Sequence, residues 1–231
     1  MKTVGIIGGI GPESTIEYYR QIIAAYREQK KDGSYPSIII DSINMKAIVD
    51  LIAAGEFSKT AEFLVSEIQR LANAGADFGL LAANTPHIVF DEISRRSPIP
   101  LLSIVEATLN AARAIGLKRV GLFGTRFTMQ GRFYTDIFSE AGIQLVVPNE
   151  DEQAYIHDKY MNELVQGIFL PDTRERLLTI VEHLKERERI DGLILGGTEL
   201  PLILRDVTDR GIPFLDTTKI HVQRIVTQLM P

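Results

Sequence analysis

The chain has 231 residues, of which 45% are hydrophobic and 24% charged, and it contains no cysteine. This composition is typical of a globular protein, and the net charge of −5 disfavours a nucleic-acid partner or an anionic membrane surface. The absence of cysteine excludes disulfides, thiolate metal sites and cysteine nucleophiles. No apolar run reaches the roughly 18 residues of a membrane span, and no secretory signal is evident, so we expect a cytoplasmic protein.

Short apolar runs alternate with amphipathic stretches, and each run is interpreted as a buried strand. The runs are apolar throughout, which is typical of parallel sheets covered on both faces. Strand–helix alternation predicts an α/β fold in which mainly parallel sheets are flanked by helices. The predicted strands, in chain order, are Val4–Ile7, Ser37–Ile40, Phe78–Leu81, Leu101–Val105, Val120–Phe123, Gln144–Val147, Gly192–Leu195 and Pro213–Leu215.

Helical spacing predicts the elements between these strands. Apolar residues from Ala61 to Ala72 recur at helical intervals, and Gly75 supplies a helix end. The pairs Ser14 with Glu17 and Asp172 with Glu175 have the spacing of capping boxes, so each pair is expected to open a helix.

The second half of the chain repeats motifs of the first half. Three motifs recur in the same order, at a nearly constant offset of about 115 residues. The repeat predicts two pseudo-symmetric α/β lobes, 1–104 plus 215–231 and 105–214, with the helix after Thr218 packed on the first lobe. Ligands of open α/β sheets bind beyond the carboxyl ends of the strands, so we expect a ligand cleft between the lobes.

Two loops of the first lobe contain candidate ligand-binding residues. The glycine-rich loop that includes Gly9 allows a ligand to approach the backbone, although a tight turn before a capped helix explains the same residues. Asn84 and Thr85 offer an amide and a hydroxyl to a ligand, or alternatively cap the next helix. His87 is a candidate acid or base, with a structural hydrogen-bonding role as the alternative.

Equivalent loops of the second lobe contain Thr125, Thr198 and Glu199. Thr125 is a candidate ligand contact. Glu199, beside Thr198, is suited to binding an ammonium group or acting as a base, whereas an acidic residue at a helix start is the alternative. The histidines have no paired spacing, so no metal site is predicted.

Taken together, these loops resemble those of the aspartate/glutamate racemase family. The resemblance covers essentially the whole chain and implies two α/β lobes, an acidic amino acid held between them, and a tendency to form homodimers. Family catalysis uses one cysteine on each side of the α-carbon, without metal or pyridoxal phosphate, so no cofactor is expected. The motifs are Gly-Gly-Ile-Gly-Pro at 8–12, Asn-Thr-Pro-His at 84–87, Gly-Thr-Arg-Phe-Thr at 124–128, Val-Pro-Asn at 147–149, Glu-Leu-Val-Gln-Gly at 163–167, Gly-Gly-Thr-Glu at 196–199 and Asp-Thr-Thr at 216–218.

The sequence departs from the family at three important positions. Ala83 and Gly197 stand where the resemblance places the two catalytic cysteines, and Ile168 stands at the position of a lysine that helps to bind the substrate's acid groups. A methyl group and a hydrogen cannot exchange protons, so two-cysteine racemisation is predicted to be absent. Cysteines at both Ala83 and Gly197 are expected to restore some α-proton exchange.

Three interpretations follow from these departures. The chain is a racemase relative with residual or altered catalysis by Glu199, His87 or a bound water, a non-catalytic protein that binds a small carboxylate or amino acid, or an engineered form of an active enzyme. In the first two, the expected ligand contacts are Gly9, Asn84, Thr85, Thr125, Thr198 and the Ile168 position.

Overall fold

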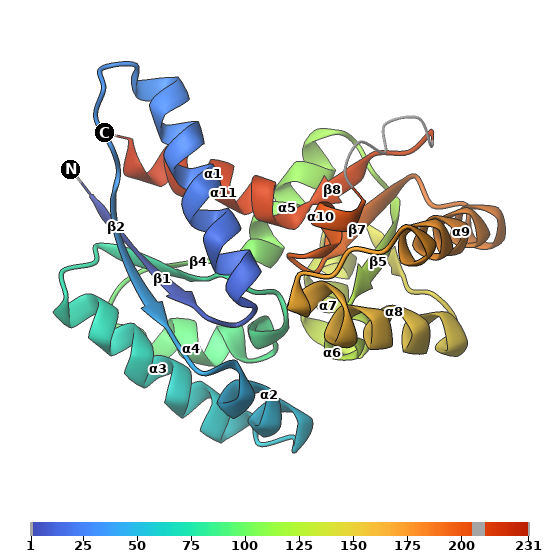
Figure 1. Cartoon of the computed structure of the whole chain (residues 1–231), viewed down its shortest axis with the longest axis horizontal. Helices are drawn as coiled ribbons and strands as arrows, with labels where there is room; N and C mark the ends of the chain where they lie inside the picture. Colours follow the sequence, from blue (N-terminus) through green and yellow to red (C-terminus); the bar gives the residue numbers. More distant parts are fainter. Residues whose placement is uncertain (1, 205–210, 231) are drawn as a thin grey trace. The chain divides into compact units, whose positions relative to one another are not determined.

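The computed structural model describes residues 2–204 and 211–230 (Figure 1). Contacts divide the chain into two compact units, Met1–Ile104 with Thr218–Pro231 (unit 1) and Val105–Thr217 (unit 2). Each unit contains a four-stranded parallel sheet, as the apolar runs predict. The domain boundaries expected at residues 104 and 214 stay a prediction, because contacts alone do not test whether the parts fold independently.

The sheet of unit 1 has the strand order β2-β1-β3-β4. Each neighbouring pair is parallel, and Ile7 of β1 lies opposite Leu81 of β3. The carboxyl ends of the two central strands therefore lie side by side. The strands are β1 (Thr3–Gly8), β2 (Ser37–Ser42), β3 (Phe78–Leu81) and β4 (Leu101–Leu102).

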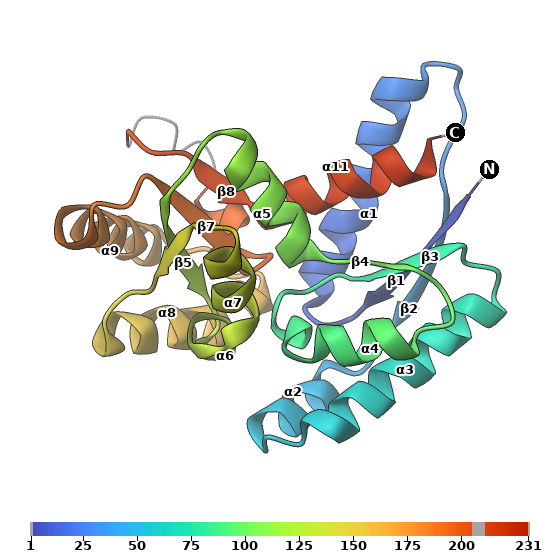
Figure 2. The same ribbon diagram turned by 180° about the vertical axis from the view of Figure 1, so that it is seen from behind.

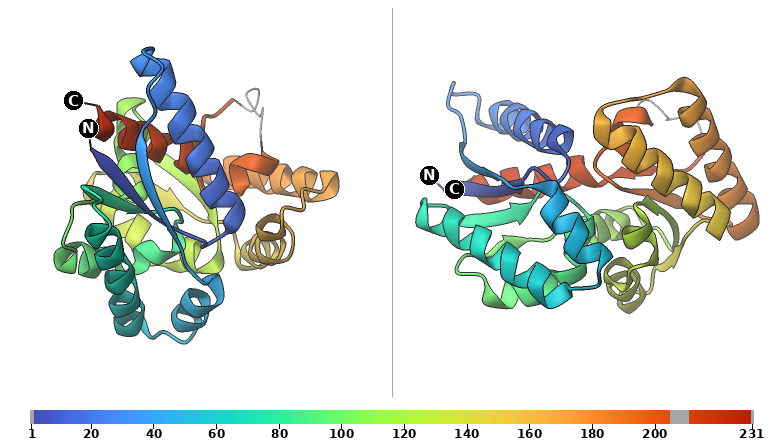
Figure 3. Two further views of the ribbon diagram at one scale, coloured as in Figure 1. Left: turned by 60° about the vertical axis from the view of Figure 1, so that its left-hand side comes forward. Right: turned by 60° about the horizontal axis from the view of Figure 1, so that its bottom comes forward.

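Helices cover both faces of this sheet. Helices α1 and α11 lie on one face, and α3 and α4 lie on the other (Figures 1 and 3). Tyr18 and Ile22 of α1 and Ile225 of α11 belong to one buried cluster with Ile6 of β1 and Leu80 of β3. The helices are α1 (Pro12–Lys30), α2 (Met45–Ala53), α3 (Phe57–Asn73), η1 (Thr85–Val89), α4 (Phe90–Arg96) and α11 (Thr217–Leu229).

The sheet of unit 2 repeats this arrangement with the strand order β6-β5-β7-β8. All of its neighbouring pairs are parallel, and Gly124 of β5 lies opposite Gly196 of β7. Strands β3 and β7 therefore hold equivalent places in the two sheets. The strands are β5 (Arg119–Gly124), β6 (Gln144–Val146), β7 (Gly192–Gly196) and β8 (Phe214–Asp216).

The helices of unit 2 also form two layers. Tyr134 of α7 is hydrogen-bonded to Thr108 of α5, so these helices pack together (Figure 2). On the opposite face, Leu184 of α9 lies against Gly121 of β5. The helices are α5 (Ile104–Ala114), α6 (Arg126–Gln130), α7 (Arg132–Glu140), α8 (Glu150–Asn162), η2 (Leu164–Gln166), α9 (Pro171–Glu188) and α10 (Leu200–Ile203).

The chain crosses between the units twice. Helix α5 follows β4 of unit 1 but lies almost entirely in unit 2, and α11 follows β8 of unit 2 but packs in unit 1. The prediction that the helix after Thr218 packs on the first half is therefore confirmed. No helix in residues 2–204 and 211–230 is both long enough and apolar enough to cross a bilayer.

Three local predictions are wrong. The strand expected over Leu101–Val105 ends at Leu102, because Ile104 already begins α5. Neither expected capping box forms: α1 begins at Pro12 and α9 at Pro171, so proline sets both helix starts. The capping box of α8 is instead made by Asn149 and Glu152.

Candidate functional site

The loops that follow β1 and β3 lie next to each other at the carboxyl edge of the first sheet. Ser14 Oγ donates a 2.7 Å hydrogen bond to the carbonyl of Ala82, which joins the two loops. Gly9 has a φ of +78°, and a Cβ there would lie 2.8 Å from the backbone nitrogen of Ile43 and closer still to its carbonyl oxygen. Backbone geometry therefore requires glycine at this position, independently of any ligand.

Ala83 and Asn84 are the second and third residues after β3 and are almost fully buried, with 6% and 3% of their surfaces exposed. The side chain of Asn84 makes no capping hydrogen bond to η1, so the alternative that it caps the next helix is wrong for this residue. Thr85, the first residue of η1, is partly buried. These three residues contribute a methyl group, an amide and a hydroxyl to the end of β3.

His87 is held at both ring nitrogens. Its Nδ1–H donates a 3.0 Å hydrogen bond to the carbonyl of Ala83, and its Nε2 accepts a 3.3 Å bond from the backbone N–H of Ile104. Burial lowers the pKa of His87 to about 4, so the ring is neutral at physiological pH. In this arrangement the imidazole links the end of β3 to the start of α5.

A second neutral histidine lies in the same unit. His221 of α11 accepts a 2.8 Å hydrogen bond at Nδ1 from the hydroxyl of Tyr18, and its Nε2–H donates to the carbonyl of Leu102. Burial, reinforced by the nearby His87, lowers the pKa of His221 to about 3. The carboxyl edge of the first sheet is therefore supported by two buried, uncharged imidazoles.

The equivalent loops of unit 2 follow β5 and β7. Thr125 caps α6, because its hydroxyl accepts a 3.3 Å hydrogen bond from the backbone N–H of Thr128. Thr125 is 7% exposed. Its side chain thus has a structural role that the loop position alone does not reveal.

Beyond β7, Glu199 is held by two hydroxyl groups. Thr198 Oγ1 donates a 2.9 Å hydrogen bond to Glu199 Oε2, and the hydroxyl of Tyr160 donates to the same oxygen. Glu199 and Thr198 are 1% and 2% exposed. Tyr160 belongs to α8, and no sequence motif singled it out.

Ile168 differs from these buried residues because its side chain is exposed. It follows Gly167 in the segment between η2 and α9, and 44% of its surface is exposed. Phe169 and Leu170 beside it are also exposed, at 39% and 45%. The position that the resemblance assigns to a substrate-binding lysine therefore holds an exposed apolar side chain.

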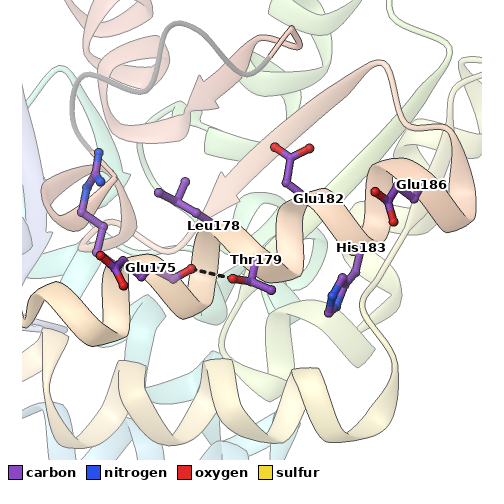
Figure 4. A pocket seen from close by; sticks show the side chains of 7 residues that line it. Glu175, Leu178, Thr179, Glu182, His183 and Glu186 are labelled. Atoms are coloured by element: carbon purple, nitrogen blue, oxygen red, sulfur yellow. Dashed lines mark hydrogen bonds between the residues drawn. The ribbon is translucent and has the colours of Figure 1, made fainter.

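The hollow drawn in Figure 4 lies elsewhere in unit 2, on the outer face of α9. It measures about 620 Å³, and the described residues that line it all belong to that helix and include Thr179, Glu182 and His183. The part of the chain that the structure describes contains no group of three or more acidic, histidine or cysteine residues suited to hold a metal ion. In each unit, the candidate residues other than Ile168 lie at or just beyond the carboxyl ends of the two central strands.

Comparison with known proteins decides the family. The model of the Asp/Glu/hydantoin racemase family matches residues 7–225. The chain belongs to this family. It is 26% identical to the broad specificity amino-acid racemase RacX of Bacillus subtilis over 220 residues, which are 93% of this chain and 92% of that protein.

Solved structures agree with this assignment. An aspartate racemase homologue from Pyrococcus horikoshii is 35% identical, with 99% of each chain covered and a TM-score of 0.84. A candidate Asp/Glu racemase from Yersinia pestis is 31% identical, with 100% of each chain covered and a TM-score of 0.90. The two parallel sheets flanked by helices are thus a racemase-like fold, here in a chain without cysteine.

Proposed function

We propose that this protein binds a small, amino-acid-like carboxylate and does not racemise it by the two-base route. The observation that carries the proposal is the identity of the residues at two equivalent strand ends, Ala83 after β3 and Gly197 after β7. Neither can accept or deliver a proton. Positioned acids and bases each contribute about 10²–10⁴-fold in rate, so the loss of both leaves no ordinary racemase mechanism.

His87 and Glu199 are poor replacements for the missing thiols. The Nδ1–H of His87 is donated to Ala83, and its Nε2 lone pair accepts from Ile104, so proton transfer would require breaking a buried hydrogen bond. Glu199 Oε2 already accepts from Tyr160 and Thr198. We therefore propose that both residues position neighbouring groups and do not transfer protons. A measured racemase activity would instead favour the interpretation that one of them is the catalyst.

The ligand is proposed to carry one carboxylate and an amino group. Asn84, Thr85 and Thr198 supply amide and hydroxyl groups at the strand ends, where open α/β sheets bind their ligands. Ile168 supplies no cation for a second carboxylate. The broad specificity stated in the name of the Bacillus subtilis relative is in keeping with a ligand other than aspartate or glutamate. Homodimer formation, a cytoplasmic location and independence of cofactors belong to the same proposal.

Isothermal titration calorimetry tests this function. Alanine, serine, aspartate and glutamate, each in both enantiomers, are titrated into the protein alongside the matched carboxylates that lack the amino group. We expect at least one amino acid to bind at millimolar concentration or below. Asn84→Ala should weaken that binding by about tenfold, the effect of losing one hydrogen bond to a charged group.

Asn110→Ala is the matched control, because Asn110 is an exposed amide on α5. It should leave both affinity and stability unchanged. If none of the amino acids or carboxylates binds at millimolar concentration, the binding proposal is wrong.

A further inference from the structure

Gly197 is a glycine because of its surroundings rather than its backbone. Its φ lies outside the positive region in which Gly9 and eight other glycines of the described residues fall, so the backbone itself would accept a side chain. A Cβ built at Gly197, however, would lie 2.9 Å from Cζ of Tyr160 and closer still to Cε2. Carbon atoms pack best at about 3.5–4.0 Å, so the ring already fills the space of a side chain at this position.

Tyr160 is anchored where it lies. Its ring is 6% exposed, and its hydroxyl donates to Glu199 Oε2, the oxygen that also accepts from Thr198. Burial raises the pKa of Tyr160 well above its ordinary value, and the negative charge of Glu199 raises it further. The phenol therefore stays protonated and remains a hydrogen-bond donor throughout the physiological pH range.

We propose that Tyr160 takes the space of the missing side chain at position 197 and is the positioning residue of Glu199. Any side chain at 197 must displace the ring, and displacing the ring withdraws its hydroxyl from Glu199. The two positions are thus coupled through an aromatic residue of a different helix. Ala83, the equivalent position of unit 1, already carries a Cβ, so the Cβ of a cysteine there displaces no neighbour.

The expectation that cysteines at positions 83 and 197 restore α-proton exchange therefore needs a further condition, which is that the ring of Tyr160 is displaced. Gly197→Cys cannot place its thiol at the strand end while Tyr160 is present. The inference rests on the proposed function only in assigning position 197 to the ligand site. Its test needs no ligand, so its failure and that of the proposed function are distinguishable.

The test is a set of single-cysteine proteins, which is possible because the chain has no cysteine of its own. Gly197→Cys is made with Tyr160, with Tyr160→Phe and with Tyr160→Leu, and each protein is compared with its parent by urea unfolding. Phenylalanine keeps the ring atoms that a Cβ would meet and is therefore the matched control, whereas leucine removes the far edge of the ring.

With tyrosine or phenylalanine at position 160, the cysteine should shift the folding equilibrium toward the unfolded state by at least about tenfold, as overpacked cores do. With Tyr160→Leu the same cysteine should cost less than about threefold. Should Tyr160→Leu fail to fold, Tyr160→Met provides a flexible side chain that can bend away from position 197. Equal costs whether position 160 holds an aromatic ring or one of these aliphatic side chains would overturn the proposal.

The coupling between position 197 and Glu199 is tested separately by the pKa of the introduced thiol, which is measured by thiolate absorbance. In the Tyr160→Leu background the thiol at 197 shares its surroundings with the carboxylate of Glu199, which should raise the thiol pKa by about one unit above 8.5. Adding Glu199→Gln should remove this shift. Ser139→Cys, at an exposed position on α7 of the same unit, is the control, and its thiol pKa should not respond to Glu199→Gln. A thiol at 197 that is equally insensitive to Glu199→Gln would show that position 197 and Glu199 are not coupled, and would overturn the proposal.

Discussion

The ends of β3 and β7 hold equivalent places in two sheets of the same topology, yet the surroundings of Ala83 and Gly197 differ. The end of β3 carries the methyl group of Ala83, and the backbone carbonyl of Ala83 accepts a hydrogen bond from His87. At the end of β7 the side chain is absent, and Tyr160 has filled its space. Position 83 thus carries a Cβ, whereas at position 197 the space of a Cβ is occupied by a residue of another helix.

The two strand ends also differ in electrostatics. Beside β3, the buried titratable groups are the neutral imidazoles of His87 and His221. Beside β7, the buried carboxyl group of Glu199 is held by Tyr160 and Thr198. Acid should therefore destabilise unit 1, because protonation of these imidazoles places positive charge in its core.

The largest effect is expected from His87→Ala. The substitution leaves a cavity and removes the partners of the Ala83 carbonyl and the Ile104 amide, so the free energy of unfolding should fall by about 3–4 kcal/mol. Chemical denaturation measures the loss. His183→Ala is the control, because the side chain of His183 is 45% exposed on α9 and makes one hydrogen bond, to Glu152, so its loss should be about 1 kcal/mol. Similar losses in the two variants would show that His87 is not the structural link inferred here.

The next effect is a loss of stability in acid. In the folded protein His87 stays neutral down to a pH of about 4, whereas its ordinary pKa is 6.5. Between these values the unfolded chain binds more protons, so His87 alone should lower the free energy of unfolding by up to about 3 kcal/mol as the pH drops from 6.5 to 4. His87→Gln, followed by urea unfolding across this range, should reduce the slope by about half, because His221, with a pKa lowered to about 3, contributes the remainder. An unchanged slope would mean that His87 is protonated in the folded state.

A smaller effect separates capping from ligand binding. Thr125→Ala removes the cap of α6 and should cost about 1 kcal/mol of stability. Asn84→Ala, which removes no cap, should cost less stability and more ligand affinity. Thermal unfolding and calorimetric titration of both variants make the comparison. If the two variants behave alike in both measurements, the assigned difference between the loops of the two units is wrong.

The smallest stability effect is expected from Ile168→Lys. Ile168 is 44% exposed, so the change should alter the free energy of unfolding by less than about 0.5 kcal/mol. The added cation should nevertheless raise the affinity for aspartate or glutamate relative to alanine, with Ile115→Lys on another exposed isoleucine as the control. Unchanged relative affinities would remove position 168 from the ligand site.

Much of the fold could be predicted from the sequence, because buried parallel strands are continuous apolar runs and their boundaries need only short-range patterns. The failures at Ser14 and Asp172 have a local cause: a proline one or two residues earlier begins each helix, so the capping side chains are too late. The spacing of Asn149 and Glu152 contained a true capping box that was not singled out.

The candidate site was only partly predictable. The loops with Asn84 and Thr198 follow apolar strands, so their place at a sheet edge could be inferred from order along the chain. The role of Tyr160 could not, because it depends on a contact with Gly197 across 37 residues that no periodicity encodes. Tyr160 is one of four buried residues of α8, with Glu152, Gln153 and Ile156, and nothing in the sequence distinguishes it from them.

Deuterium incorporation at the α-carbon tests directly whether the protein lacks two-base racemisation. The unmodified protein is incubated in heavy water with the amino acids that bind it and with aspartate and glutamate, and α-deuterium is followed by proton NMR over days. We expect no incorporation above that of protein-free buffer, because Ala83 and Gly197 can neither remove nor return the α-proton. Incorporation that depends on the protein and is lost in Glu199→Gln or His87→Gln would contradict the account and make that residue the catalyst.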